Sequence, residues 1–317
     1  MIIICQKCMT RFHLDDDATD KSTFVARCTV CGHLFSAYKP NRVQEITFLD
    51  LEKARHDKTD DRVIAVSNRK GGVAKTTTCL NLGVSLTLLK KRVLLVDFDA
   101  QANLTLALGQ KEAPTFYDAQ KEIGKRLDAF IVTTKYPNLR LLPSGRNMVL
   151  LNKMYFGAGN FEYMLKDRLN GVTEQFDFIL IDTPPSIEFY TLNALTASNR
   201  VLIPCQCDYL STHGVDQVLR LIKLIREKSN PQIQSRILFT MLDRGSQASR
   251  LILGKIQSLY QGQTFDTVIE MDGTLKEAQI LNMPAIQYSQ KSVAGTQYIE
   301  LAKEVIAITE ASAPPSP

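Results

Sequence analysis

Short apolar runs alternate with longer stretches of helical period from Arg62 to about Thr309. The runs are rich in Val, Ile and Leu, and they predict strands at residues 63–67, 93–97, 139–142, 178–182, 201–204, 237–241 and 267–269. The stretches between most of them predict helices, notably at residues 75–90, 212–228, 246–260 and 293–309. Strands and helices that alternate in this way are typical of an α/β fold with a doubly wound, mostly parallel sheet.

The two ends of the chain depart from this pattern. Residues 1–38 carry paired cysteines, and residues 39–61 are polar and charged with a few scattered apolar positions. We interpret residues 39–61 as a linker with one or two helical turns around Ile46–Ala54. Residues 311–317 have nothing to bury, so we expect a disordered tail. The predicted organisation is a small module at 1–38, the linker, an α/β domain at 62–310 and the tail.

Composition indicates a globular protein with a full core. Of the 317 residues, 44% are hydrophobic and 22% are charged, which excludes disordered, collagen-like and coiled-coil classes. No apolar run approaches the length of a membrane span, and the first residues are too few for a signal peptide. We therefore expect a cytoplasmic protein. The net charge of +5 permits nucleic acid as a partner without requiring it.

Four of the seven cysteines form two Cys-x2-Cys pairs with nineteen residues between the pairs, namely Cys5, Cys8, Cys28 and Cys31. In a chain without an export signal, this spacing indicates a four-thiolate Zn²⁺ site rather than disulfides. Four unrelated cysteines are the alternative. His13 and His33 are candidate substitute ligands, although four thiolates already complete a tetrahedron. The segment is similar to the short zinc ribbons at the N termini of many bacterial proteins, which implies a structural site in an adaptor module.

The first predicted strand is followed by NRKGGVAKTT, residues 68–77, which opens a helix. A standard phosphate loop has the form G-x4-G-K-[ST], and Lys75 and Thr76 supply its last two positions. Arg69 and Ala74 replace its two glycines, so the strict motif fails.

The glycine pair Gly71–Gly72 still allows the backbone to wrap around phosphates. The helix that follows presents free amides and the positive end of its dipole. A glycine turn that merely joins strand to helix is the alternative, but it leaves two lysines and a run of threonines unexplained. We therefore predict a nucleotide site here.

KGGVAKTT resembles the deviant Walker A motif of the ParA/MinD family of ATPases, in which an extra lysine, here Lys70, precedes the glycine pair. The resemblance continues through VLLVDFDAQANLT, LRLLPSG, FDFILIDTPPS and VLIPCQCDYLSTHG, and it covers nearly everything from Arg62 to about Thr309. Ala74 stands where many members have glycine, and we expect a negative φ there. The resemblance implies a P-loop NTPase fold of the deviant type that hydrolyses ATP to ADP and phosphate with Mg²⁺ as cofactor.

Phosphoryl transfer needs positioned groups that stabilise charge rather than covalent intermediates. The residues expected to bind the nucleotide are Lys70, Gly71, Gly72, Val73, Ala74, Lys75, Thr76 and Thr77. Lys75 should contact the β and γ phosphates, and the Thr76 hydroxyl should bind Mg²⁺. The predicted catalytic residues are Lys70, Lys75 and Asp99.

Three aspartates follow predicted strands. Asp182 ends the apolar strand FILID, the Walker B arrangement that holds the metal, and Asp97 is expected to support the metal shell. Asp99 matches the family's switch aspartate, which orients the attacking water. Each could singly cap a strand end, but three at the carboxyl ends of parallel strands indicate the ligand crevice of such a sheet.

The resemblance also implies that Lys70 reaches across a nucleotide-sandwich homodimer to the partner's phosphates, as an arginine finger acts in trans. ATP would then assemble the dimer, and hydrolysis, stimulated by a partner protein, would release it. Members of the family that segregate or position DNA or large protein cargo bind DNA nonspecifically as ATP dimers. A cargo or adaptor would dock on the zinc ribbon.

Residues 201–260 contain eight basic and four acidic side chains. The candidate DNA contacts among them are Arg220, Lys223, Arg226, Arg244 and Arg250. A solvated helix face is the alternative for each. The segment MDGTLKEAQ resembles an arginine-bearing stretch of the family, yet it has Thr274 where arginine is often found, with Lys276 as a candidate substitute. If DNA is bound, the protein would associate with the bacterial nucleoid.

The C-terminal segment and the zinc ribbon bear on other functions. MinD-like members end in a basic amphipathic membrane helix, whereas this chain ends in LAKEVIAITEASAPPSP, which is acidic and then rich in proline, so we expect no membrane partner. A nucleotide-gated regulatory scaffold that binds protein partners through the zinc ribbon, without DNA, is the alternative function.

Overall fold

The computed structural model describes residues 2–4, 11–13, 23–38, 61–155, 159–186, 189–208 and 211–311. The chain divides into two compact units, Met1–Ala54 and Arg55–Pro317. The helical turns expected around Ile46–Ala54 lie outside the described residues, as does the tail after Ala311.

The N-terminal unit contains two short antiparallel hairpins. β1 (Ile2–Ile4) pairs with β2 (Arg11–His13), and β3 (Thr23–Arg27) pairs with β4 (Leu34–Tyr38). The turn between β3 and β4 carries the second cysteine pair. Such a unit is small, and small units often need a metal or disulfides for stability because they bury little apolar surface.

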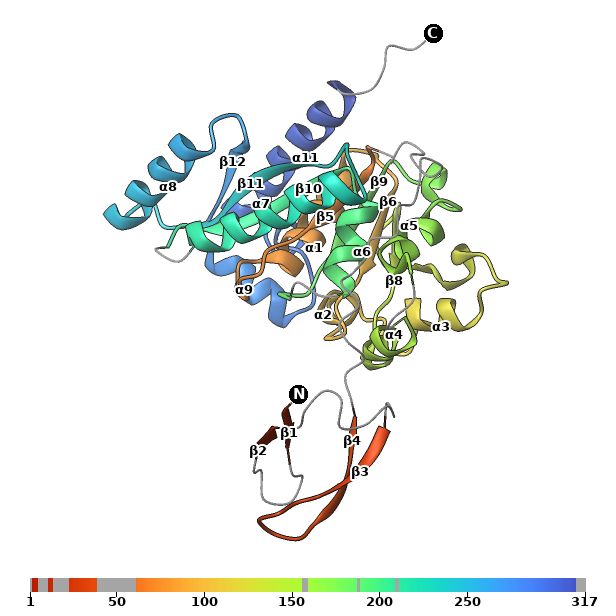
Figure 1. Ribbon diagram of the computed structural model, residues 1–317. Helices are drawn as coiled ribbons and strands as arrows, with labels where there is room; N and C mark the ends of the chain where they lie inside the picture. Colours follow the sequence, from red (N-terminus) through yellow and green to blue (C-terminus); the bar gives the residue numbers. More distant parts are fainter. Residues whose placement is uncertain are drawn as a thin grey trace. The chain divides into compact units, whose positions relative to one another are not determined.

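An eight-stranded sheet forms the centre of the second unit, in the order β12-β11-β10-β5-β9-β6-β8-β7 (Figure 1). Its strands are β5 (Val63–Val66), β6 (Val93–Asp97), β7 (Val132–Thr133), β8 (Leu139–Leu142), β9 (Phe178–Asp182), β10 (Arg200–Gln206), β11 (Gln234–Leu242) and β12 (Thr264–Glu270). Every pairing is parallel except that of β7 with β8. The carboxyl ends of the parallel strands therefore meet at one edge of the sheet.

Helices cover both faces of this sheet, which explains why its central strands read as continuous apolar runs. The larger helices are α1 (Lys75–Leu88), α6 (Phe189–Ala197), α7 (Ser211–Lys228), α8 (Gln247–Leu259) and α11 (Val293–Ala311). α1 and α11 pack on one face, together with Val66 and Leu95, and α6 and α7 pack on the other, together with Ala65 and Val96 (Figure 1). Alternate residues of each strand thus enter two separate cores.

Shorter helices lie between strands and, after β12, before α11. They are α2 (Asn103–Ala107), α3 (Phe116–Lys121), α4 (Val149–Met154), α5 (Met164–Leu169), α9 (Gly273–Ile280) and α10 (Ala285–Tyr288). Four single turns of 3₁₀ helix accompany them, at Leu127–Phe130, Arg146–Met148, Phe161–Tyr163 and Thr173–Gln175. Among the described residues, no helix combines the length and the apolar character that crossing a bilayer requires.

All seven expected strands are present, and the expected doubly wound sheet is confirmed. β10, β11 and β12 are longer than expected, and β7 was not expected because it has only two residues. The four expected long helices correspond to α1, α7, α8 and α11. Helices of four to eight residues were not specified, since so few positions do not establish a helical period.

Candidate nucleotide site

The loop between β5 and α1 lies at the carboxyl edge of the sheet and is tied to two neighbouring strands. The buried Asn68 donates from Nδ2 to the carbonyl oxygen of Pro204 at 2.7 Å, and its Oδ1 accepts from the Lys70 amide at 3.0 Å. The carbonyl oxygen of Val73 accepts from Thr240 Oγ1 at 3.2 Å. These contacts fix both ends of the loop at the place where open α/β sheets bind ligands.

The end of the loop corrects one expectation from the sequence. Ala74 has φ 69° and ψ 32°, the left-handed conformation, so the negative φ expected at this position was wrong. The carbonyl oxygen of Ala74 accepts from the Thr78 amide at 2.8 Å and is the first acceptor of α1. Because the chain must turn into the helix at this residue, Ala74 carries a conformation that glycine adopts without steric cost.

Replacing Ala74 with glycine should therefore stabilise the domain. An L-residue in the left-handed region costs about 1–2 kcal/mol, and part of that gain is offset by the greater freedom of glycine in the unfolded chain. We expect Ala74→Gly to raise the free energy of unfolding by about 1 kcal/mol, as measured by urea denaturation. Ala307→Gly, at an exposed position inside α11, is the matched control and should lower it by about 1 kcal/mol. If both substitutions change the free energy of unfolding in the same direction, Ala74 is not strained.

The two lysines of the loop lie in different surroundings. Lys75 is buried, and its Nζ donates to the carbonyl oxygen of Lys70 at 3.0 Å. Burial lowers the pKa of Lys75, and the nearby charges of Asp182 and Asp99 act in the opposite direction. The ammonium of Lys70 is partly exposed and forms an ion pair with Asp208, which follows β10. The Lys75 ammonium thus contacts its own loop, whereas the Lys70 ammonium is held by a residue that follows another strand.

Asp182, the last residue of β9, has features expected of a metal-holding carboxylate. It is buried, and burial together with the charge of Asp97 raises its pKa well above the ordinary range. A hydrogen bond from Thr76 and the charge of Lys75 oppose this shift. Within the described part of the chain, the buried Oδ1 of Asp182 has no hydrogen-bond partner. A carboxylate and a hydroxyl side by side, with one oxygen unsatisfied, fit the oxygen ligands that Mg²⁺ prefers.

Asp97 is fully buried at the end of β6, and both of its oxygens accept hydrogen bonds from the chain that follows. Oδ2 accepts from the amide and the hydroxyl of Thr105, at 2.8 and 2.7 Å, and Oδ1 accepts from the Asp99 amide at 3.2 Å. Burial raises the pKa of Asp97 to about 6, against the effect of the Thr105 hydrogen bonds. The geometry thus ties Asp97 to the position of the loop that carries Asp99.

The Asp99 carboxylate is less enclosed. Its Oδ1 accepts from the Gln101 amide at 2.9 Å, while its carbonyl oxygen accepts from Ser144 Oγ at 2.6 Å. The Ser144 amide donates in turn to Thr105 Oγ1 at 2.9 Å, which links the segment after β8 to α2. The structure brings Lys75, Asp182 and Asp99 together at one edge of the sheet.

The sequence did not single out Asn68, Thr105, Ser144 or Asp208, although each lies in or beside a segment that carried the family resemblance. Each is a polar residue near the carboxyl end of a strand, which is the signal that could have found them. Their contacts join residues up to 138 positions apart, and such pairings are not visible in a single sequence.

The segment that carries Thr274 contacts the first turn of α1. Thr77, an expected nucleotide-binding residue, accepts from Gln279 Nε2 at 3.1 Å through its hydroxyl. Thr274 is the second residue of α9: its amide donates to Oδ1 of the N-cap residue Asp272 at 2.9 Å, and its hydroxyl lies 2.7 Å from Ser292 Oγ. Asp272 therefore caps α9, and the Thr274 amide is the group that it caps.

The five candidate DNA-binding residues divide into three groups. Arg220 and Lys223 are exposed on α7. Arg226, on the same helix, donates from Nε and Nη2 to the carbonyl oxygen of Ile233. Arg244 pairs with Glu270, and Arg250 Nη1 donates to the carbonyl oxygen of Arg244, so these two are engaged near the end of β11. Arg220 and Lys223 therefore form an exposed cationic stripe on α7.

The second cysteine pair has the geometry of a zinc knuckle. The Cys31 amide lies 3.4 Å from Sγ of the buried Cys28, and the Gly32 amide donates to the Cys28 carbonyl oxygen at 2.9 Å. Gly32 has φ 71°, a left-handed conformation that glycine adopts without steric cost. An amide aimed at sulfur stabilises a metal-bound thiolate. Cys5 and Cys8 lie outside the described residues.

Both units are similar to known protein families. A family model described as an AAA domain matches residues 61–235, and a zinc-ribbon domain model matches residues 1–36. The sporulation initiation inhibitor protein Soj of Bacillus subtilis is 36% identical over 250 residues, which cover 78% of this chain and 98% of Soj. The chromosome partitioning protein ParA of Myxococcus xanthus is 32% identical over 252 residues, covering 78% of this chain and 89% of ParA.

Among solved structures, one described as cobyrinic acid a,c-diamide synthase from Mycobacterium smegmatis, with bound ADP and magnesium, is 32% identical. It superimposes with a TM-score of 0.69 and covers 80% of this chain and 96% of its own. The match to the AAA domain model, over residues 61–235, includes the loop and the three aspartates described above.

Proposed function

The chain belongs to the ParA/MinD family of P-loop partition and positioning ATPases, and from this premise we propose that it cycles between a monomer and an ATP-sandwich dimer to segregate or position DNA or a large protein cargo. The chain is an ATPase, with ATP and Mg²⁺ as cofactors of the second unit and Zn²⁺ as cofactor of the zinc ribbon. Its cargo, its dimer and the partner protein that stimulates hydrolysis are parts of the proposal.

In this proposal, the backbone from Lys70 to Thr77 surrounds the phosphates, and Lys75 neutralises the β and γ groups. Bound Mg²⁺ supplies further positive charge at the phosphates, and Thr76 and Asp182 are the residues that hold it. Asp99 orients the attacking water, and Asp97 keeps the Asp99 loop in place through Thr105. The buried, partnerless Oδ1 of Asp182 supports the metal role.

The different surroundings of the two lysines are the observation that carries the dimer. The Lys75 ammonium already supplies a positive charge to the loop of its own subunit. A second ammonium is therefore not needed at the same phosphates. Lys70 is partly exposed and is held by Asp208 through an ion pair between groups that are 27% and 36% exposed. Pairs this exposed contribute little stability, about 0–1 kcal/mol, so Lys70 can leave Asp208 for the phosphates of a second subunit at small cost.

The exposed stripe of α7 supports nonspecific DNA binding by the dimer. Arg220 and Lys223 are exposed there, so phosphates can reach them. A monomer offers few phosphate contacts, and pairing two subunits makes weak contacts simultaneous, which raises the affinity through effective concentration. ATP would thus control DNA binding through dimerisation.

Retention of duplex DNA tests this function. We expect the full chain to retain DNA with ATP but not with ADP or without nucleotide, independently of DNA sequence and with a steep loss as salt rises. Arg220→Glu and Lys223→Glu should each lower the slope of log affinity against log salt by about one or more. Arg140→Glu, at an exposed position on β8, is the matched control and should change little.

An absence of DNA retention at low salt by an ATP-bound dimer would favour the second candidate, a nucleotide-gated scaffold that binds proteins through its zinc ribbon. A specific observation supports that candidate. Thr274 stands where the family often has arginine and is hydrogen-bonded to Asp272 and Ser292, and Arg244 is paired with Glu270. Both features reduce the cationic surface near the end of β11.

A further inference from the structure

A cavity of about 350 Å³ lies at the edge of the sheet opposite the nucleotide site. It is lined by the first residues of β10 and β11, by the start of β12, and by Val305 and Ile308 of α11. The nucleotide loop follows the carboxyl end of β5, whereas the cavity touches Ile64 near the beginning of that strand. The two sites are therefore separated by the length of the strands.

Three arginines line this cavity: Arg200, Arg226 and Arg236. Arg200 begins β10, Arg226 lies in the last turn of α7, and Arg236 lies near the start of β11. Parallel strands with a common starting edge bring these side chains together from three separate elements. No aspartate or glutamate is among the described residues that line the cavity.

The guanidinium groups of Arg226 and Arg236 donate to carbonyl oxygens. Arg226 donates to the Ile233 carbonyl oxygen at 2.9 Å from Nη2, and Arg236 donates to the Thr264 carbonyl oxygen at 3.2 Å from Nη1. The side chain of Arg200 is only 12% exposed, and its Nη2 lies 3.5 Å from a carboxylate oxygen of Asp61. Asp61 is thus a carboxylate partner of Arg200, whereas Arg226 and Arg236 form no ion pair with the described residues.

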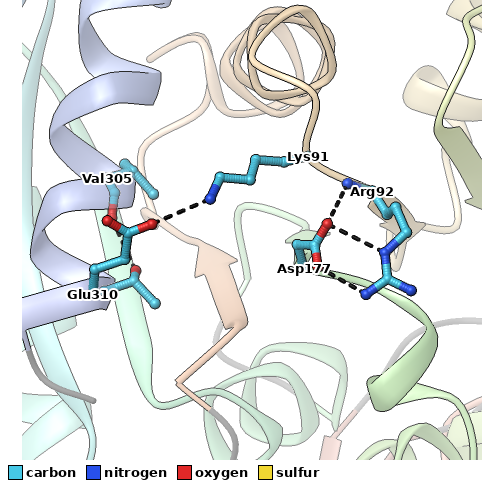
Figure 2. A network of polar contacts seen from close by, with 6 residues as sticks. Lys91, Arg92, Asp177, Val305 and Glu310 are labelled. Atoms are coloured by element: carbon cyan, nitrogen blue, oxygen red, sulfur yellow. Dashed lines mark hydrogen bonds and ion pairs between the residues drawn. The ribbon is translucent and has the colours of Figure 1, made fainter. Parts of the chain in front are cut away.

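Other cations at the same edge of the sheet are neutralised differently (Figure 2). Arg92 makes a two-pronged contact with Asp177, including Nη2 to Oδ1 at 2.8 Å, and its hydrogen bonds lower the pKa of Asp177. Lys91 Nζ lies 3.2 Å from Glu310 Oε1 on α11. Lys91 and Arg92 therefore have acidic partners, whereas the described residues provide none to Arg226 and Arg236.

A guanidinium offers five donors and remains charged at any physiological pH, and its planar fork matches phosphate oxygens. Phe265 and Ile64 add apolar wall, and Gln234 and Gln263 add amides that can select a polar group. The volume falls in the range of small-molecule pockets, about 300–1,000 Å³. We propose that this cavity binds a small organic phosphate of the mononucleotide class, separately from the ATP of the nucleotide loop.

Calorimetric titration with AMP as the probe tests the proposal. The full chain is first saturated with ADP and Mg²⁺, so that the nucleotide loop is filled. We expect AMP to bind this complex with one site per chain. Arg226→Gln and Arg236→Gln should each weaken that binding by about tenfold or more, because each removes a charge-assisted hydrogen bond. Arg236→Lys, which keeps the charge but loses the fork, should weaken it less.

Arg140→Gln is the matched control and should leave AMP binding unchanged. Each variant is also checked for an unchanged melting temperature and an unchanged ADP affinity, which separates loss of the site from loss of the fold. No heat at millimolar AMP would overturn the proposal. AMP binding that is unaffected by Arg226→Gln and Arg236→Gln, or that competes with ADP, would overturn it as well.

Discussion

Replacing Lys75 with alanine is expected to abolish ATP binding at concentrations where the parent chain is saturated. The Lys75 ammonium is buried beside the loop and donates to the Lys70 carbonyl oxygen at 3.0 Å, so it is already positioned without reorganisation. A charge-assisted contact of this kind contributes about 1.5–3 kcal/mol, and a lysine that reaches two phosphate groups makes more than one. We expect Lys75→Ala to raise the dissociation constant at least about a hundredfold, measured by calorimetry.

Lys70→Ala should behave differently, because the proposed role of Lys70 is at the partner's phosphates. We expect this variant to retain most of its ATP affinity but to lose ATP-induced dimerisation and turnover, measured by sedimentation velocity and phosphate release. Arg69→Ala is the matched control, since it removes a charge from an exposed residue of the same loop. Normal dimerisation and hydrolysis by Lys70→Ala would show that the sandwich mechanism does not operate in this chain.

Asp99→Ala is expected to slow hydrolysis by about a hundredfold or more while ATP and metal binding persist, because it removes only the group that orients water. The backbone of Asp99 makes the contacts that place the loop, through its amide to Asp97 and its carbonyl oxygen to Ser144, and alanine keeps both. The hydrogen bond from the Gln101 amide to the Asp99 side chain is lost. The variant should accumulate as an ATP-bound dimer.

Single-turnover phosphate release, together with sedimentation in ATP, measures this outcome. Gln101→Ala, at an exposed position in the same loop, is the control and should hydrolyse ATP near the parent rate. If Asp99→Ala hydrolyses ATP at the parent rate, another residue orients the attacking water. Asp97 would be a poor replacement, since its two oxygens are engaged with Thr105 and the Asp99 amide.

The sequence alone was sufficient for the main elements of the second unit. Apolar runs such as those at β6 and β9 are local features, and helices on both faces of a parallel sheet require them to be continuous. The loop was found for a similar reason, since its lysines and glycines lie within eight consecutive residues. The spacing of the four cysteines is likewise a local pattern, and it agrees with the zinc-ribbon match over residues 1–36.

The tertiary structure decided how these residues meet. The φ of Ala74 depends on the direction in which the loop must enter α1, and no residue type in the motif specifies it. Asp97 is held by hydrogen bonds, whereas the Asp99 carboxylate is less enclosed. This difference depends on where Thr105 and Ser144 lie after α2 and β8 are packed.

The cavity with three arginines depends on the fold still more strongly. In the sequence, the three arginines appear as separate charges on two strands and a helix, namely Arg200, Arg236 and Arg226. Parallel strands place their beginnings at one edge whatever their separation along the chain, and α7 returns to that edge because a crossover helix runs antiparallel to the strands it connects. Sequence therefore determined which elements form, and packing determined which charges share a cavity.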